Sequence, residues 1–115
     1  DDLLHHAQRG AVFETWVVAE TLKHRFNRAL AADLYFWRDN HGLEVDLVVE
    51  HGGKLQPVEC KSGTTYSADW TGPVRRWCQA AGPDAAQPLL VYGGDHSHLR
   101  PDHQVLSWHD LGFSA

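Results

Sequence analysis

The sequence predicts an α/β fold in which a mixed β-sheet with an antiparallel hairpin is flanked by helices. Three observations predict it: a long stretch with helical spacing, two alternating runs joined by Gly-Gly, and a short run of almost only apolar residues. The predicted order is helix, three strands, helix and one or two strands. A length of 115 residues is that of a single domain, 1–115.

The first helix is predicted from Gly10 to about Leu30, because apolar residues recur there at helical spacing without a proline. The run 34–39 is rich in aromatic residues and predicts a strand, closed by a turn at 40–42. The alternating run 43–50 predicts a second strand.

The turn His51-Gly-Gly-Lys54 leads into a third strand that ends in "PVECK". A second helix is predicted over 74–82, where Gly82 and Pro83 end it. The apolar run 88–94 predicts a strand buried on both faces. The segment 104–111 predicts a final edge strand or a turn.

The Gly-Gly turn predicts the hairpin register, because a two-residue loop pairs His51 with Lys54. Asp46 then lies opposite Glu59, and Glu44 lies opposite Lys61. The core face is predicted to carry Val45, Leu47, Val49, Gln56, Val58 and Cys60. The other face is predicted to carry Glu44, Asp46, Val48, Glu50, Leu55, Pro57, Glu59 and Lys61.

The pairing of Asp46 with Glu59 has two interpretations, because like charges directly opposite one another destabilise a sheet. Either the face is solvated and the pair Glu44–Lys61 offsets the repulsion, or a divalent cation such as Mg²⁺ binds between the two carboxylates. The residue pattern leaves both open.

Composition limits the function classes. The formal net charge of −5 and the pI of about 5.9 argue against gripping nucleic acid by bulk charge, although a local basic patch of Arg38, Lys54, Arg75 and Arg76 remains an option beside an ordinary solvated surface. Trp37, Trp70 and Trp77 either stack on bases or, as the spacing favours, belong to the core. Nine histidines include pairs at 5–6 and 96–98, for which scattered surface histidine is favoured over a metal site.

No run is long and apolar enough to span a membrane, and these residues show no signal-peptide pattern. With only Cys60 and Cys78, we expect a reducing, cytoplasmic setting. Because the chain starts at Asp1 and contains no methionine, we expect it to be an excised part of a longer protein.

The order "EVD", hairpin, "VECK" resembles the PD-(D/E)XK signature of restriction-endonuclease-like phosphodiesterases, without the proline before Asp46. More narrowly, "RGAVFETWVVAETL", "FWRDNHGLEVDLVVE", "PVECKSGTT", "VYGGD" and "VLSWHDL" look like the domain of unknown function that follows a P-loop ATPase module in many bacterial and archaeal ATPases of the AAA class. The resemblance covers about 10–111 of the chain.

This resemblance implies a restriction-endonuclease-like core and a metal-dependent nuclease acting on DNA or RNA. Asp46, Glu59 and the carbonyl of Cys60 would hold Mg²⁺ or Mn²⁺ with Glu14, for which Glu20 is the second choice, and Lys61 would stabilise developing charge. It also implies an upstream ATPase module as partner, since this chain has no GxxxxGK[ST] loop. The competing class is a non-catalytic module that docks a partner or binds nucleic acid.

Overall fold

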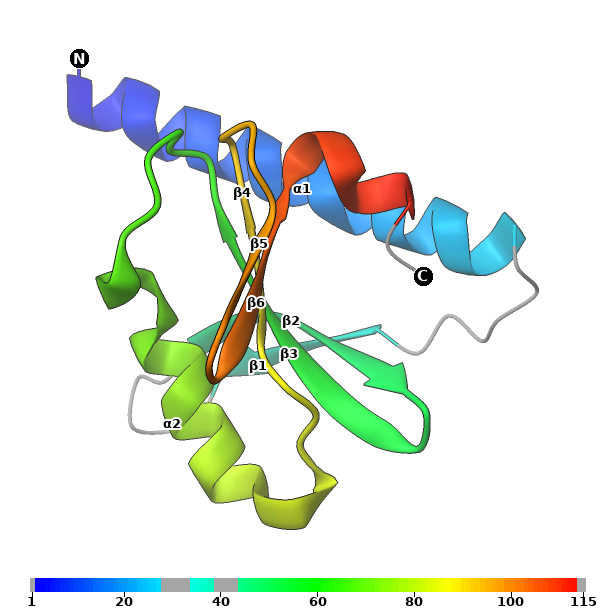
Figure 1. The fold of residues 1–115 in the computed structure, drawn as a ribbon. Coiled ribbons are helices and arrows are strands. Elements are labelled where there is room, and N and C mark those ends of the chain that lie inside the picture. The colour runs from blue at the N-terminus through cyan, green and yellow to red at the C-terminus, as the bar shows by residue number, and fades with distance from the viewer. Residues whose placement is uncertain (1, 28–33, 39–43, 114–115) are drawn as a thin grey trace.

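We describe residues 2–27, 34–38 and 44–113 of the protein from a computed structural model (Figure 1). They form a six-stranded sheet in the order β1-β2-β3-β4-β6-β5. The strands are β1 (Leu34–Arg38), β2 (Glu44–His51), β3 (Lys54–Lys61), β4 (Leu89–Tyr92), β5 (His98–Arg100) and β6 (His103–Ser107). The pairs β3–β4 and β4–β6 are parallel and the other pairs antiparallel, so the predicted mixed α/β sheet is confirmed.

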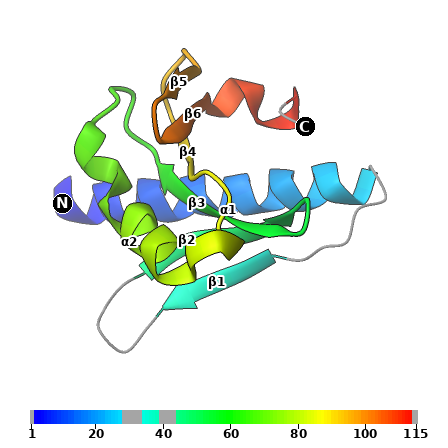
Figure 2. The ribbon, with the colours of Figure 1, turned by 60° about the horizontal axis from the view of Figure 1, so that its bottom comes forward.

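Two α-helices cover the sheet, α1 (Asp2–Asn27) and α2 (Gly72–Ala81), with short 3₁₀ segments η1 (Ala68–Thr71), η2 (Gly82–Asp84) and η3 (Trp108–Phe113). Figures 1 and 2 show α1 and α2 on different sides of the sheet. Val17 of α1 packs against Leu47 and Val91 in one cluster, whereas Val74 and Trp77 of α2 pack against Val48 in another. Both faces of the sheet are therefore core.

The first helix begins earlier than predicted, at Asp2 instead of Gly10. Residues 2–9 contain neither proline nor glycine, so nothing in them ends a helix. Gly10 itself sits inside the helix with open space around the position of a Cβ atom, which shows that no close contact requires glycine there. The predicted end near Leu30 and the turn at 40–42 lie outside the described residues.

The hairpin register is confirmed from the turn as far as Leu47, which pairs with Val58. Gly52 and Gly53 have φ angles of 60° and 80°, the left-handed values that a two-residue hairpin turn of the I′ type requires. Val48 lies opposite Pro57. Counted from the turn, these two residues form a non-hydrogen-bonded pair, so the missing N–H of proline costs no hydrogen bond between β2 and β3.

The end of the chain differs from the prediction. The segment 104–111 divides into β6 and η3, and β6 lies inside the sheet between β4 and β5. The edge strand on this side of the sheet is β5, which the sequence did not indicate because three residues are too short for a periodic pattern. The prediction for 88–94 is correct: Leu90, Val91 and Tyr92 are buried between two parallel neighbours.

Among the described residues, no helix combines the length and hydropathy that crossing a bilayer requires.

Candidate functional site

A β-bulge in β2 shapes the region around Asp46. Tyr35 of β1 pairs with Val48 and Trp37 pairs with Val45, so the single residue Phe36 faces two residues of β2, Asp46 and Leu47. An extra residue of this kind bends a strand and redirects its side chains, and such bulges are common next to active sites. The bulge lies at the point where the first predicted carboxylate stands.

The bulge also corrects the predicted faces of the hairpin. Leu47, Val49, Val58 and Cys60 pack on the α1 side as predicted, but Val45 packs with Val48 on the α2 side. Residues three apart share a face only where the alternation is interrupted. The prediction was wrong for Val45 because the pattern of one strand does not reveal the extra residue that its neighbour creates.

The other predicted face is covered as well. Val48, Pro57 and Glu59 are buried, and Leu55 packs with the α2 cluster. Helix α2 lies over this face, which the hairpin pattern alone could not show. The interpretation of a solvated charged face is therefore wrong for Glu59, which is only 5 % exposed.

Asp46 binds the backbone of the partner strand. Its Oδ2 accepts a hydrogen bond from the N–H of Cys60 at 2.8 Å. Continued past Leu47 and Val58, the register would give this N–H to the carbonyl of Val45. The Asp46 carboxylate thus takes the place of the Val45 carbonyl as acceptor, at the point where β2 and β3 separate. It therefore lies beside Glu59 and Cys60.

Glu59 is the central group of the site. It lies on β3 between β2 and β4, where its Cα partner on the parallel side is Leu90. Burial, then the hydrogen bond to Asp46 and the charge of Asp46, together raise the pKa of Glu59 to about 8, and Lys61 offsets part of the rise. Below about pH 8 the carboxyl keeps its proton, which it can donate to Asp46.

Lys61 completes this group. Its Nζ lies 3.6 Å from Oε2 of Glu59, and its side chain is 39 % exposed while that of Glu59 is 7 % exposed. The ammonium therefore reaches solvent at the end of β3, and the carboxyl behind it does not. A negatively charged ligand that approaches the site from solvent would meet Lys61 first.

Two further predicted residues lie near this group. Burial, followed by the charges of Asp46, Glu14 and Glu59, raises the pKa of the Cys60 thiol. Because the charge of Glu14 contributes to this shift, α1 brings Glu14 near the Cys60 thiol on the α1 side of the sheet, and Glu20 is not among the charges that raise this pKa. Cys60 itself packs against the α1 cluster, as its predicted inward orientation requires.

The predicted basic residues do not gather at the site. Lys54 lies at the opposite end of β3, and seven steps of about 3.3 Å put it roughly 23 Å from Lys61. Arg75 of α2 pairs with Asp102 at 3.1 Å, and Arg76 is exposed on the same helix. Arg38 ends β1, and its side chain lies outside what the structure describes.

The tryptophans follow the core interpretation where they are described. Trp77 is 3 % exposed in the α2 cluster, and Trp70 packs against buried Leu90 and Tyr92. The side chain of Trp37 lies outside the described residues. The side chains of His5 and His6 also lie outside the described residues. The ring of His98, from the second histidine pair, contacts the ring of Tyr66 at a centroid distance of 5.2 Å.

A second polar group escaped the sequence analysis. His103 is 2 % exposed, its Nδ1 lies 2.8 Å from Asp102 and its Nε2 lies 2.9 Å from the hydroxyl of Tyr66. Arg75 pairs with Asp102, and Arg100 lies over the Tyr66 ring at 4.7 Å. These residues come from two loops, a helix and two strands, so no sequence spacing signals their contact.

The loop after Lys61 is tied to the end of β4. The N–H of Gly93 donates to the carbonyls of Lys61 and Gly63, each at 3.0 Å. A Cβ atom on Gly93 would lie 2.3 Å from the carbonyl oxygen of Ser62, so only glycine permits this approach. The backbone around Lys61 is therefore closely held.

Comparison with curated proteins and with solved structures finds no match for the chain. Residues 9–111 match "Domain of unknown function (DUF4143)", a kind of domain that is generally found C-terminal to AAA ATPase modules. The predicted resemblance to that family is thereby confirmed. Because the match covers nearly all of the 115 residues, the chain belongs to the DUF4143 family.

Proposed function

We propose that this domain is a metal-dependent phosphodiesterase that acts on nucleic acid, with a restriction-endonuclease-like core. One observation carries the proposal: Asp46, Glu59 and Lys61 converge where β2 and β3 separate, with Glu59 buried between a carboxylate and an ammonium. A buried carboxyl beside a second carboxylate is costly to keep ionised unless a cation joins it. Perturbed carboxyls of this kind concentrate at functional sites.

The donor set fits a hard divalent cation such as Mg²⁺ or Mn²⁺. Magnesium uses one or two carboxylates and keeps several waters, and Asp46 retains Oδ1 after Oδ2 accepts the N–H of Cys60. Among the described residues, no group of three or more His, Cys, Asp and Glu side chains is placed to hold a metal. A cation here would therefore rely on Asp46, Glu59, the Cys60 carbonyl and water, with Glu14 acting through water.

Each residue of the group would have a distinct role. A bound divalent cation supplies Lewis acidity and lowers the pKa of a bound water. Asp46 and Glu59 would hold the cation, and Glu59 would release its proton when it binds. Lys61 reaches solvent at the mouth of the site, where its ammonium would stabilise negative charge that develops on a phosphate.

A second candidate function rests on the family. Since DUF4143 domains generally follow AAA ATPase modules, this domain would act as a non-catalytic part of such an ATPase, docking a protein partner or holding nucleic acid. The net charge of −5 favours this alternative, because it weakens binding to phosphates. In both cases we propose the ATPase module of the same chain as a partner.

Calorimetric titration with Mg²⁺ and Mn²⁺ tests the first proposal. We expect binding that is lost in Asp46→Asn and in Glu59→Gln and kept in Glu50→Gln, a matched change near the turn of the same hairpin. Cleavage of single- and double-stranded DNA and RNA should fall at least about 100-fold in Asp46→Ala and Lys61→Ala. Lys54→Ala, the same change at the other end of β3, should leave cleavage intact.

Absence of both metal binding and cleavage would favour the alternative, a non-catalytic domain. If wild-type protein binds neither cation at millimolar concentration and cleaves none of the substrates, the catalytic proposal is wrong. Circular dichroism of every variant shows whether a loss reflects unfolding.

A further inference from the structure

A hollow of about 530 Å³ lies between the first half of α1 and the start of η3. On its α1 side it is lined by Val12, Phe13 and Trp16. Val12 is 70 % exposed and Trp16 is 36 % exposed, although both are large apolar side chains. Of the three large apolar residues that the described chain exposes, two therefore line one hollow, which is typical of a binding surface.

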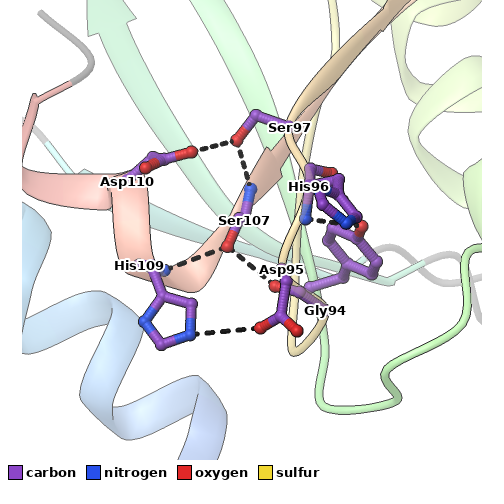
Figure 3. Close-up of polar contacts among 8 residues, drawn as sticks. Gly94, Asp95, His96, Ser97, Ser107, His109 and Asp110 are labelled. Carbon is purple, nitrogen blue, oxygen red and sulfur yellow. Dashed lines mark hydrogen bonds and ion pairs between the residues drawn. The ribbon is translucent and has the colours of Figure 1, made fainter.

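The wall next to Trp16 is formed by Trp108, which is held in place. Its ring meets that of Trp16 edge to face at a centroid distance of 5.6 Å and lies 3.9 Å from that of His109. Figure 3 shows the polar contacts that fasten the start of η3: Ser97 donates to Asp110 at 2.6 Å, Ser107 Oγ donates to the Gly94 carbonyl at 2.7 Å, and His109 pairs with Asp95 at 3.3 Å. Because this wall is ordered before binding, a ligand would not have to order it.

The floor of the hollow lies at the end of β3 that carries Lys61. It includes Ser62 and Gly93, and Ser62 directly follows Lys61 in the chain. The hydrogen bonds from Gly93 to Lys61 and Gly63 hold this floor against the end of β3. A strand with a base in the hollow, on the α1 side, would therefore pass over the end of β3 to bring a phosphate to the Lys61 ammonium, which lies with Glu59 on the α2 side.

The charge of the lining selects among ligands. The remaining lining residues are Gln8 and Arg9, so the hollow contains one cation and no carboxylate, in a chain with 15 Asp and Glu residues against 10 Lys and Arg. A flat apolar ligand next to a negative charge matches this combination. The volume is that of a pocket for one compact molecule and not of an extended groove for a helix.

We propose that the hollow binds one nucleobase of a single-stranded nucleic acid whose adjoining phosphate lies at Lys61, with the base against Trp16 and Trp108 and a neighbouring phosphate at Arg9. Stacking of bases on tryptophan needs no particular sequence, and bases are free to enter a side pocket only where the strand is unpaired. This inference deepens the proposed function and rests on it for the position of the phosphate. The substrate class is thus single-stranded nucleic acid.

The test measures binding apart from catalysis. Fluorescence anisotropy of a fluorescein-labelled single-stranded oligothymidylate is followed in chelator, in the Asp46→Asn background, so that cleavage cannot occur. We expect Trp16→Leu and Trp108→Leu each to weaken binding roughly ten-fold, as loss of one stacked base does. Val12→Ser should weaken it about two- to five-fold through lost apolar contact. Leu99→Ser, a matched change at an apolar residue that is 76 % exposed on β5, should not change it.

The outcomes separate this inference from the proposed nuclease function. If Trp16→Leu and Trp108→Leu fold normally and bind the oligonucleotide as tightly as their parent, the base-binding inference is overturned, while metal binding and cleavage by wild-type protein still stand. If cleavage and metal binding fail but binding depends on Trp16, the hollow is a base site on a non-catalytic domain. A helical apolar peptide that binds through Trp16 where the oligonucleotide does not would assign the hollow to a protein partner and overturn the inference.

Discussion

Two buried polar groups on the same sheet differ in how their charges and hydrogen bonds are balanced. Around His103, each group meets a complementary partner: Nδ1 is hydrogen-bonded to Asp102, Nε2 is hydrogen-bonded to the Tyr66 hydroxyl, and Arg75 neutralises Asp102. Around Glu59, a buried carboxyl faces a second carboxylate, Asp46, and the cation beside it among the described residues is the ammonium of Lys61. The first group is complete without a ligand and stabilises the fold, whereas the second is balanced only by holding a proton or by binding a cation.

Replacing the centre of the complete group should have the largest effect. In His103→Ala we expect the free energy of unfolding to fall by about 2 to 4 kcal/mol, because the change opens a cavity and leaves the Tyr66 hydroxyl without its partner. Urea denaturation at pH 7 measures the loss. His98→Ala, at a less buried histidine that also meets the Tyr66 ring, should cost clearly less. Equal losses would show that His103 is not the centre of this group.

Replacing Glu59 should change the free energy of unfolding in the opposite direction at high pH. Its pKa is raised from 4.5 to about 8, so the folded protein holds this proton more tightly than the unfolded chain does. Stability is therefore lost as pH rises from about 4.5 to 8 and changes no further from this source above that range. The amide of Gln imitates the protonated carboxyl, so Glu59→Gln should match wild-type protein near pH 5.

Near pH 9, in chelator, Glu59→Gln should be more stable than wild-type protein by about 1 to 3 kcal/mol. Urea denaturation of both proteins at the two pH values measures this difference, with Glu50→Gln as the matched control. A variant that is less stable than wild-type protein at high pH would mean that Glu59 is ionised and well paired in the fold. The contrast between the two polar groups would then disappear.

The smallest change removes a single hydroxyl. Tyr66→Phe keeps the ring that packs against Trp70 and beneath Arg100, but leaves Nε2 of His103 without its hydrogen-bond partner. We expect a loss of about 1 to 2 kcal/mol in the free energy of unfolding, measured by thermal and urea denaturation. Tyr66→Leu, which also removes the ring, should cost more. No loss in Tyr66→Phe would indicate that the His103 group tolerates an unpaired nitrogen.

The two groups also differ in how far the sequence reveals them. Asp46, Glu59 and Lys61 belong to one hairpin, and its Gly-Gly turn sets a register from which their proximity follows. His103 meets Tyr66 across 37 residues of chain, and its other partner, Asp102, binds Arg75 across 27. Such contacts depend on how β6, α2 and the loop after β3 pack, so no local pattern predicts them.

By itself, the sequence determined the class and order of the main elements, the hairpin turn and the inward position of Cys60, because each follows from local periodicity and turn chemistry. Only the tertiary structure decided that both faces of the hairpin are buried, since α2 covers the face that carries Val48 and Glu59. It also decided the bulge at Asp46, which arises from pairing with β1. Burial and strand pairing join distant segments, and they give Glu59 the environment that makes it a candidate for chemistry.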